Sequence, residues 1–420
     1  MLRLNLATDP AVIALWFILP VSQIAGAVLP ASDSQDVTDL QIKPRLVRVL
    51  IAADVRRLRL DADGPVSVRD NNGQPLNQLP ALHGVVVEAQ GSVLRIGSRT
   101  CDAAEVLLTP ERASLRAAVE QGDAWSAGLE YPGALRVAMN KAGTLDAINL
   151  VDIEEYVAAV VANEVWPTFD QEALRAQAVV SRTFVLYQMN RRPAGEVDLT
   201  ATQSSQVYRG LRRDEVGRLA KEAAEFTRGI VLTYRDEGGV PRLFCTYYSA
   251  ACGGSSQSAA LLGPEGDVPP LRGGVACDYC RIAPGDAYRW GPVALETTEV
   301  LSRLRGRFAE LSDVTSIRAI EAVQTTNSGR PVTWRVIGAA GEQYDFLAER
   351  LRLAIDGGVV RSTDCRIRVT DGRVIFEDGK GYGHGLGLCQ WGMQGQALEG
   401  RRAGQILTYY FPGASLTRVY

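Results

Sequence analysis

One carboxylate near the middle of the chain stands where it could perform acid–base chemistry. Glu164 lies in the stretch "VVANEVWPTFDQEALRAQAVVSRTF", between an apolar run and a Trp-Pro pair. Apolar neighbours disfavour an ionised carboxylate and raise its pKa, and a carboxyl group that stays protonated near neutral pH can act as a general acid. A glutamate at a helix end can equally form a solvated ion pair, and a single glutamate does not separate these two interpretations.

Two arginines follow Glu164 at helical spacing. Arg175 and Arg182 are seven residues apart, so they lie on roughly one face of a helix. An arginine on that face could bind substrate oxygens in a bidentate manner, or it could be an ordinary surface charge. If an arginine faced Glu164, its charge would lower the pKa of the carboxyl group, which opposes the effect of the apolar neighbours.

A glycine-rich loop near the C-terminus surrounds a histidine. The stretch "GYGHGLGLCQWG" has glycines at alternate positions around His384. Alternating glycines let the backbone approach a ligand or another segment closely. The loop lacks the Lys-Ser/Thr that completes a phosphate-binding loop. His384 could therefore polarise a substrate, bind a metal ion or hold the loop through a hydrogen bond.

The seven cysteines of the chain allow several kinds of site. Cys277 and Cys280 form "CDYC", a spacing that suits a zinc knuckle or a redox pair. In an exported protein the cysteines could instead pair as disulfides, with one left over because the count is odd. Cys101, Cys245 and Cys365 lie in strand-like sequence, and we expect them in the core.

The first 30 residues have the pattern of an export signal. Arg3 precedes an almost wholly apolar run from Ala11 to Ala27, which ends in the small-residue pattern "AGA". We expect residues 1–30 to be a signal peptide or, because the run nearly reaches spanning length, a membrane anchor. A buried N-terminal helix is the remaining alternative. An export signal predicts a protein of the periplasm or cell envelope.

The composition is ordinary for a soluble globular protein. Of the 420 residues, 46% are hydrophobic and 22% are charged, and the net charge is −3. Nothing in this balance suggests an electrostatic nucleic-acid binder. The length exceeds that of a typical small domain, so more than one domain is expected.

The elements that must position these residues change type along the chain. Residues 41–149 have strand patterns, including hairpins in "HGVVVEAQGSVLRIG" and "GALRVAMNKAGTLDAIN". Apolar stripes at helical spacing follow over residues 153–190, and Pro167 and Asp170 interrupt them, which predicts two helices joined by a short turn. A third helix is predicted at residues 216–227, followed by the strands "GIVLTY" and "LFCTYYSA". The mixture indicates the α+β class.

Five stretches, taken in order, resemble the SpoIID/LytB family, which is named for stage II sporulation protein D and an amidase-enhancer relative. They are "VDIEEYVAAVVANEVWP...EALRAQAVVSRTF", "SSQVYRG", "ACGGSS", "CDYCRIAPGDAYRW" and "GYGHGLGLCQWGM". The resemblance implies a SpoIID-type α+β catalytic domain over residues 135–413, with an inserted strand-and-helix subregion at 295–380. Residues 41–134 would then be an N-terminal β-rich region and residues 414–420 a C-terminal tail.

The resemblance also implies an activity on peptidoglycan. The family is similar in function to lytic transglycosylases, which cleave the MurNAc–GlcNAc backbone without water and leave a 1,6-anhydro end. Its catalytic glutamate matches Glu164, and a supporting arginine of its helix motif matches Arg182. The residues expected to contact the substrate are Arg175, Tyr208, His384 and Gln390.

A single carboxyl group suffices for such a reaction. Glu164 would protonate the glycosidic oxygen and then, as a carboxylate, take the proton from the C6 hydroxyl that attacks C1. A two-carboxylate hydrolase would need a partner at about 5–10 Å; Glu154 and Glu155 lie two or more helical turns away, and we expect them on the surface. The main alternative is a non-catalytic, wall-binding activator of an N-acetylmuramoyl-L-alanine amidase. The sequence does not distinguish sporulation, division and wall turnover.

Sporulation members of the family carry a zinc ion near the Cys-Gly-Gly stretch, but the ligands of those relatives do not carry over directly to this chain. Many relatives have a histidine beside that stretch, where this chain has Ser249 and Ser255. The remaining candidates are four thiolates, which satisfy tetrahedral zinc: Cys252, Cys277, Cys280 and Cys389. His384 is the reserve ligand, and disulfides or buried free thiols remain the alternatives. A closed four-thiolate site leaves no open coordination position on the zinc ion for a water molecule. This disfavours a zinc-dependent hydrolase.

Overall fold

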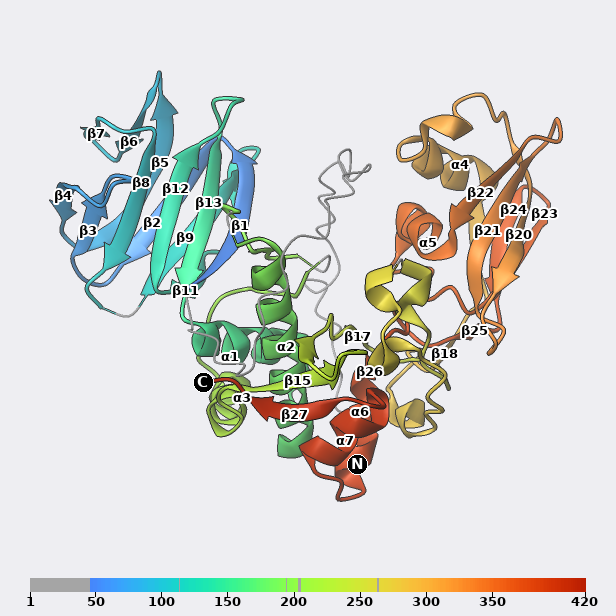
Figure 1. Ribbon diagram of the computed structural model, residues 1–420. Helices are drawn as coiled ribbons and strands as arrows, with labels where there is room; N and C mark the ends of the chain where they lie inside the picture. Colours follow the sequence, from blue (N-terminus) through green and yellow to red (C-terminus); the bar gives the residue numbers. More distant parts are fainter. Residues whose placement is uncertain (1–45, 113, 194, 203–204, 263) are drawn as a thin grey trace, which may run out of the picture. The chain divides into compact units, whose positions relative to one another are not determined.

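The computed structural model describes residues 46–420 apart from positions 113, 194, 203–204 and 263 (Figure 1). Helices and strands occur in mixed order over this range, and the strands form several separate sheets, so the predicted α+β class is confirmed. The predicted signal or anchor segment, residues 1–30, lies outside the described residues.

The first part of the described chain forms two sheets that share a hydrophobic core. One has the strand order β14-β1-β13-β12-β8-β3-β4, and the other β10-β9-β2-β5-β6-β7 with β11 paired to β9. The strands are β1 (Val47–Val55), β2 (Arg57–Ala62), β3 (Val66–Arg69), β4 (Pro75–Leu79), β5 (Leu82–Gln90), β6 (Val93–Ile96), β7 (Arg99–Cys101), β8 (Glu105–Pro110), β9 (Ser114–Gln121), β10 (Ala124–Trp125), β11 (Leu129–Pro132), β12 (Ala134–Met139), β13 (Leu145–Val151) and β14 (Leu199–Thr200). In β2, buried Leu58 and Leu60 alternate with less buried arginines, as a strand with one core face requires.

Both hairpins expected from the sequence are present. β5 pairs with β6, and β12 pairs with β13 around a turn that contains Gly143. β13 also pairs with β1, so strands on either side of residue 134 belong to one sheet. The boundary predicted between residues 134 and 135 therefore cuts through a continuous sheet, because the second hairpin buries its apolar face against the N-terminal strands.

Two helices joined by a short turn follow, as predicted, and a third packs on both. They are α1 (Ile153–Glu164), α2 (Gln171–Arg191) and α3 (Glu215–Phe226). Asp152 and Asp170 are the N-caps of α1 and α2, and each accepts a hydrogen bond from a backbone N–H of the first turn. The sequence between the caps, with Pro167, therefore sets the short turn that carries Glu164 at its start.

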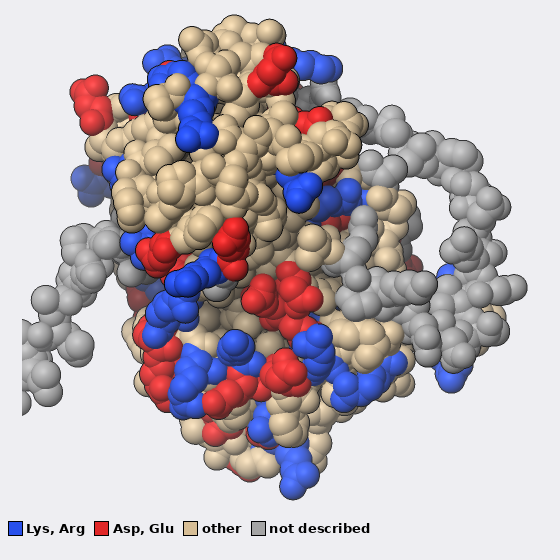
Figure 2. All heavy atoms as spheres, turned by 90° about the vertical axis from the view of Figure 1, so that its left-hand side faces the viewer, with Lys and Arg blue, Asp and Glu red and all other residues tan. Residues whose placement is uncertain are grey.

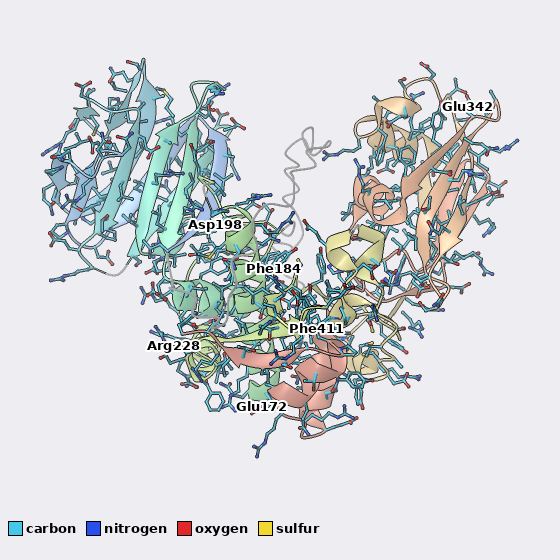
Figure 3. The ribbon with its side chains drawn as sticks, viewed as in Figure 1. Glu172, Phe184, Asp198, Arg228, Glu342 and Phe411 are labelled. Carbon is cyan, nitrogen blue, oxygen red and sulfur yellow. The ribbon has the colours of Figure 1, made fainter. Side chains whose placement is uncertain are left out.

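Small sheets and two short helices complete this core (Figure 3). Their elements are β15 (Ile230–Arg235), β16 (Pro241–Leu243), β17 (Tyr248–Ser249), β26 (Leu388–Cys389), α6 (Gln390–Leu398), α7 (Ala403–Tyr410) and β27 (Ser415–Arg418). "LFCTYYSA" is not one strand, because β16 and β17 occupy only its ends and pair with different partners. Residues 414–420, set apart above as a tail, contain β27, which pairs with β15. Glu172 of α2 accepts a hydrogen bond from the backbone of Ala403 (2.8 Å) at the start of α7.

A second hydrophobic core lies between Trp290 and Phe376. Its elements are β18 (Arg289–Trp290), β19 (Val293–Glu296), α4 (Thr297–Arg305), β20 (Ile317–Thr325), β21 (Pro331–Gly338), β22 (Gln343–Leu347), α5 (Ala348–Asp356), β23 (Arg366–Thr370), β24 (Arg373–Glu377) and β25 (Gly379–Lys380). Short 3₁₀ helices are η2 (Ala259–Leu262), η3 (Pro264–Gly266), η4 (Pro269–Leu271), η5 (Tyr279–Ile282) and η6 (Ala309–Leu311). Buried Arg330 donates a hydrogen bond to the carbonyl oxygen of Cys252 (2.5 Å), which ties this region to the cysteine-bearing segment.

Acidic and basic side chains lie interspersed on the face shown in Figure 2, with no broad field of one sign. Such a surface agrees with the near-neutral net charge of −3. Within residues 46–420, none of the helices that the structure describes combines the length and the apolar character needed to cross a membrane.

Candidate active site

Glu164 is the last residue of α1, and the local sequence explains why the helix ends there. Val165 adopts an extended conformation. Trp166 precedes Pro167, and a residue before proline is disfavoured in the helical conformation. The chain therefore turns directly after Glu164, which leaves the carboxyl group at the junction between α1 and the turn to α2.

Two hydrogen-bond donors from distant parts of the chain hold the Glu164 carboxylate. The backbone N–H of Val207 and the hydroxyl of Tyr248 both donate to Oε1, at 2.7 Å and 2.8 Å. Val207 belongs to the "SSQVYRG" stretch, and Tyr248 lies in β17. Because donors from two segments meet on one oxygen, the orientation of the carboxyl group is fixed before any ligand arrives.

Burial raises the pKa of Glu164 above the usual glutamate value. The hydrogen bonds from Val207 and Tyr248 act in the opposite direction, as does the positive charge of exposed Arg209. Burial has the larger effect, so the direction expected from the apolar neighbours is confirmed. The opposing cation is Arg209, rather than either helix arginine considered above.

Gln390 connects this site to the glycine-rich loop. Its side-chain N–H group donates to the backbone oxygen of Glu164 and to Oε1 of Gln177, at 3.3 Å each. Gln177 in turn donates to Ser181 on the same helix (3.2 Å). Of the four residues expected to contact substrate, Gln390 is therefore the one that the structure brings against Glu164.

Arg182 and Glu154 form a buried ion pair at the other end of α1. The guanidinium donates to both carboxylate oxygens of Glu154, at 2.8 Å and 2.5 Å, and neither side chain is more than 6% exposed. Glu154 and Glu164 are ten residues apart on α1, which corresponds to about 15 Å along the helix axis. The surface position predicted for Glu154 is wrong, because Arg182 compensates its charge; Glu155, in contrast, is exposed.

The surroundings of this pair show that it supports the fold. Arg182 also donates to the backbone oxygens of Ala224 (3.0 Å) and Ile230 (3.1 Å). Although burial alone would raise it, the pKa of Glu154 is lowered by the hydrogen bonds and charge of Arg182, with a further hydrogen bond from Tyr420. Arg182 therefore joins α1, α2 and the end of α3, and it does not contact Glu164 as a supporting catalytic residue would.

Removal of the Arg182 guanidinium should destabilise the protein strongly. In Arg182→Met the charge of Glu154 stays buried without its partner, and breaking such a pair costs about 3–5 kcal/mol of unfolding free energy. Replacing both partners in Glu154→Leu/Arg182→Met should restore most of that loss. Urea unfolding measures both changes. Arg175→Met, which removes a partly exposed arginine of the same helix, is the control. A stable Arg182→Met protein without activity would contradict the structural role.

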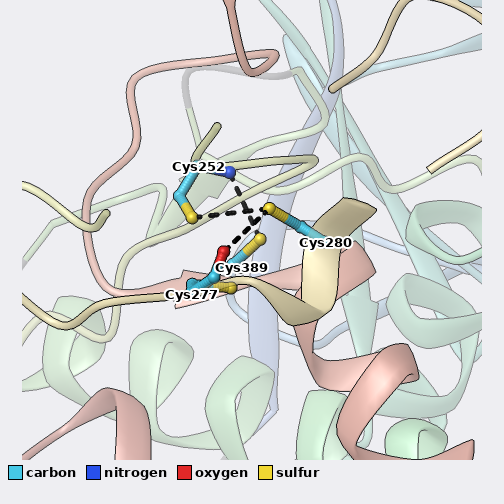
Figure 4. Close-up of side chains that lie close together, drawn as sticks. All are labelled: Cys252, Cys277, Cys280 and Cys389. Carbon is cyan, nitrogen blue, oxygen red and sulfur yellow. Dashed lines mark hydrogen bonds between the residues drawn. The ribbon is translucent and has the colours of Figure 1, made fainter. Parts of the chain in front are cut away.

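Four thiols converge beside the glycine-rich loop (Figure 4). The sulfur atoms of the four predicted ligands lie within 4.8 Å of one another, and all four residues are buried: Cys252, Cys277, Cys280 and Cys389. The Sγ atoms of Cys252 and Cys280 are 3.8 Å apart, and none of the seven cysteines, all of which lie in the described residues, forms a disulfide. Zinc–sulfur bonds of about 2.3 Å in a tetrahedron require sulfurs about 3.8 Å apart. The geometry thus fits a four-coordinate zinc ion better than a disulfide.

The backbone around the thiols suits a metal-bound thiolate. Cys389 Sγ accepts hydrogen bonds from the backbone N–H groups of Cys252 (3.2 Å) and Gly392 (3.3 Å), which would stabilise negative charge on the sulfur. A Cβ atom on Gly392 would lie 2.5 Å from the sulfur of Cys277, so glycine is required there. Cys389 is the N-cap of α6 and directly precedes Gln390, so the cluster holds the helix start that contacts Glu164. His384 is not part of this group.

Comparison with known proteins identifies the family. The family model described as Stage II sporulation protein, SpoIID, matches residues 141–234, which contain α1, α2 and α3. An uncharacterized protein of Brachyspira hyodysenteriae is 30% identical over 299 residues, which cover 69% of this chain and 73% of the relative. This chain belongs to the SpoIID/LytB family.

Named relatives from Bacillus subtilis extend the SpoIID/LytB likeness beyond the helices. Stage II sporulation protein D is 25% identical over 284 residues, covering 64% of this chain and 76% of the relative. Amidase enhancer is 25% identical over 296 residues, covering 61% of this chain but only 40% of the relative. The likeness to each of them is thus longer than the segment that the SpoIID family model matches.

Two other residues expected to contact substrate have structural roles in this SpoIID/LytB chain. Tyr208 is 1% exposed; its hydroxyl donates to Asn149 (2.6 Å), and its ring lies 5.0 Å from that of Tyr156. Tyr208 packs against Tyr156 of α1 and is not accessible to a substrate. The prediction that Tyr208 contacts the substrate is therefore wrong. Arg175 pairs with Glu172, and its guanidinium carbon lies 3.7 Å from the ring centre of Phe226, away from the contacts of Glu164.

His384 is half-buried and neutral at physiological pH. Burial lowers its pKa to about 4. Its Nδ1 accepts a hydrogen bond from the backbone N–H of Leu386 (3.0 Å), so the ring proton resides on Nε2. The ring lies 6.1 Å from that of Tyr247. This arrangement holds the loop in the manner considered from the sequence, and the ring also forms a hydrogen bond with the backbone of Tyr248.

Tyr248, Val207 and Arg209 were not among the residues expected from the sequence at this SpoIID/LytB site. Tyr248 is brought to Glu164 by the pairing of β17 with β26, between residues that are about 140 positions apart in the chain. The available signals were weak: Tyr248 lies just before the Cys-Gly-Gly stretch, while Val207 and Arg209 lie in "SSQVYRG". Neither pattern by itself indicates a contact with a carboxylate.

Loss of the Tyr248 hydroxyl should change the pH dependence of the site. A hydrogen bond to a carboxylate lowers its pKa, so Tyr248→Phe should raise the pKa of Glu164 further. If Glu164 acts as a general acid, the pH at which activity falls on the alkaline side, where the acid loses its proton, should then move upward. A pH–rate profile measures the change. Tyr247→Phe, which removes the neighbouring hydroxyl, should leave the profile in place; equal profiles for all three proteins would contradict this assignment.

Proposed function

We propose that this protein cleaves the glycan strands of peptidoglycan by a lytic transglycosylase mechanism. The observation that carries the proposal is Glu164: an oriented carboxyl group whose pKa is raised by burial and which two donors hold from distant segments. The relatives named stage II sporulation protein D and amidase enhancer support a role in the cell wall or in sporulation. Such a role requires a location in the cell envelope, where the substrate is.

The mechanism needs one protonated carboxyl group and a nucleophile that belongs to the substrate. Glu164 donates its proton to the glycosidic oxygen as the bond to C1 breaks. Its carboxylate then accepts the proton of the C6 hydroxyl while that oxygen attacks C1, which closes the 1,6-anhydro ring and returns Glu164 to its acid form. Tyr248 and the Val207 N–H stabilise the carboxylate between the two steps.

Glu154 and Glu155, the two carboxylates considered as partners of Glu164, lie ten and nine residues before it on α1, farther than hydrolysis allows. Hydrolases that use two carboxylates keep them about 5–10 Å apart. Glu154 is about 15 Å away along α1 and is occupied by Arg182. The groups that act most strongly on the pKa of Glu164 are donors and a cation. This supports transfer to the substrate's own hydroxyl over attack by water.

We further propose that the four-cysteine cluster binds a structural zinc ion. Four thiolate ligands would close the coordination sphere, so the ion would stabilise the fold and would not activate water. The residues that would hold it anchor the start of α6, and with it Gln390 beside Glu164.

Activation of an amidase is the second candidate function, because one relative is named amidase enhancer. The present chain covers 40% of that relative, so an activity located elsewhere in the relative need not be shared. The two functions differ in whether Glu164 must turn over substrate.

Product analysis in ¹⁸O-water tests the proposed reaction. Purified glycan strands, incubated with the protein, should yield fragments that end in 1,6-anhydroMurNAc and carry no solvent oxygen, as measured by mass spectrometry. Label at the new reducing end would instead mean hydrolysis. Stimulation of an added amidase without any strand cleavage would favour the activator.

A further inference from the structure

Trp166 is an exposed aromatic residue for which the proposed mechanism gives no use. Its side chain is 54% exposed, whereas Trp391, Trp290 and Trp334 are at most 8% exposed and Trp125 is intermediate. Among the tryptophans that the structure describes, Trp166 is thus the one on the surface. An isolated exposed apolar side chain is common on proteins, so its position and support must show whether it has a function.

Other aromatic rings support the indole of Trp166. Its ring centre lies 5.8 Å from that of Trp391, at an interplanar angle of 49°, and Phe169 contacts Trp391 edge-on at 5.0 Å. Trp391 belongs to α6, whereas Trp166 and Phe169 lie in the turn between α1 and α2. Aromatic pairs at such distances hold each other in place.

Hydrogen bonds from α6 fix the same turn. The side chain of Gln394 accepts a hydrogen bond from the backbone N–H of Asp170 (2.7 Å) and donates to the carbonyl oxygen of Thr168 (3.5 Å). Gln394 is 4% exposed, so these bonds are shielded from water. The turn therefore holds Trp166 in one orientation before a ligand binds. Little further conformational entropy of the turn would be lost on binding.

The exposed indole also lies close to the proposed catalytic acid. Trp166 follows Glu164 by two residues, so their Cα atoms can be at most about 7 Å apart. Gln390, the residue before Trp391, contacts the backbone of Glu164 (3.3 Å). The carboxyl group and the aromatic support thus share the same two elements, the turn after α1 and the start of α6.

We propose that Trp166 forms a sugar subsite, in which the exposed face of its indole stacks on a pyranose ring of an N-acetylated glycan strand next to the bond that Glu164 cleaves. A pyranose ring with equatorial substituents exposes C–H groups on its faces, and these groups carry partial positive charge. The face of an indole is negative and apolar, so it attracts such groups and excludes water from them. The subsite rests on the proposed function, because it assumes a glycan substrate.

Binding measurements on a variant that cannot cleave test this subsite. Denuded glycan strands, prepared by amidase digestion of peptidoglycan and fractionated by length, are titrated into Glu164→Gln and into Glu164→Gln/Trp166→Ala. The second protein should bind about 5- to 10-fold more weakly, the loss expected for one aromatic contact. Trp166→Phe in the same background should recover most of the affinity. Leu398→Ala, which truncates a 64% exposed side chain at the far end of α6, is the matched control.

Tryptophan emission gives a readout that a merely structural role would not change. Strands added to Glu164→Gln should shift the emission, and most of that shift should disappear in Glu164→Gln/Trp166→Phe. Thermal unfolding should show that both proteins remain folded at the temperature of the titration.

The outcomes separate this inference from the proposed function. Equal affinity with and without Trp166, in a protein whose wild type cleaves strands, overturns the subsite and leaves the proposed function standing. Failure of Glu164→Gln to bind strands, together with no cleavage by the wild type, overturns both. Weaker binding for Trp166→Ala with recovery by Trp166→Phe supports the subsite even if the reaction proves to be hydrolysis.

Discussion

Glu164→Gln should abolish strand cleavage and leave the fold intact. The amide keeps the size of the carboxyl group and can still accept the hydrogen bonds of Val207 and Tyr248, but it cannot give a proton to the glycosidic oxygen. Loss of general acid–base catalysis is typically worth about 10²–10⁴-fold in rate. Release of 1,6-anhydro products from purified strands measures the effect. Glu155→Gln, on the exposed side of the same helix, should cleave at the wild-type rate.

The same variant should be more stable than the wild type at higher pH. The pKa of Glu164 is raised in the folded state, so the folded protein binds that proton more tightly than the unfolded chain does. The stability from this protonation is present below the usual carboxyl pKa and is lost as the pH rises through the raised pKa. Glutamine does not titrate, so the difference in unfolding temperature should grow in favour of Glu164→Gln as the pH increases. Near wild-type strand cleavage by Glu164→Gln would refute the assignment of Glu164 as the general acid.

The local sequence pattern correctly predicted the two helices and the turn that carry Glu164. Helical spacing, two aspartate caps and a proline located α1, α2 and the turn between them, and the apolar neighbours of Glu164 indicated the direction of its pKa shift. These features depend on residues that are close in sequence. The position of Glu164 at the helix end could therefore be derived without knowledge of tertiary contacts.

Arg182 was expected to support Glu164, and helix geometry explains why it does not contact it. Arg182 is eleven residues beyond the start of α2, and Glu154 is ten residues before the end of α1. In an antiparallel pair joined by a short turn, residues at equal distances from the turn lie opposite each other, so Arg182 faces the start of α1. Helical phase gave the face of α2 correctly, but the distance from the turn decides which partner is reached.

The positions of Tyr208 and Tyr248 depend on contacts between segments that are far apart in the sequence. Tyr208 is buried because Tyr156 from α1 and Tyr131 from β11 pack on it, and Tyr248 reaches Glu164 through a two-residue strand pairing. Neither arrangement leaves a periodic signal in the sequence. Residues that complete the site from other segments therefore required the structure.

Protein purified without chelator should contain about one zinc ion per chain, and the loss of one cluster thiol should remove it. The four sulfurs already lie within 4.8 Å of one another in a buried, disulfide-free arrangement. A structural zinc ion contributes about 10 kcal/mol or more in small zinc-binding peptides. Cys277→Ser and Cys280→Ser should therefore lower the unfolding free energy by more than the roughly 3 kcal/mol that bounds most single substitutions. Elemental analysis and chemical unfolding measure the two effects.

A buried thiol outside the cluster provides the control for the cost of placing a hydroxyl in the core. Cys245 is 4% exposed and is not among the four, so Cys245→Ser should keep the zinc and lose less stability. Because Cys389 caps α6 and Gln390 contacts Glu164, zinc loss should also reduce cleavage although Glu164 itself is unchanged. Addition of a strong chelator to the wild type should reproduce both the lower unfolding temperature and the lower activity, while Cys245→Ser should respond to the chelator as the wild type does. A zinc content near zero in the untreated protein, or equal losses of stability in Cys245→Ser and Cys277→Ser, would show that the cluster is a set of packed free thiols.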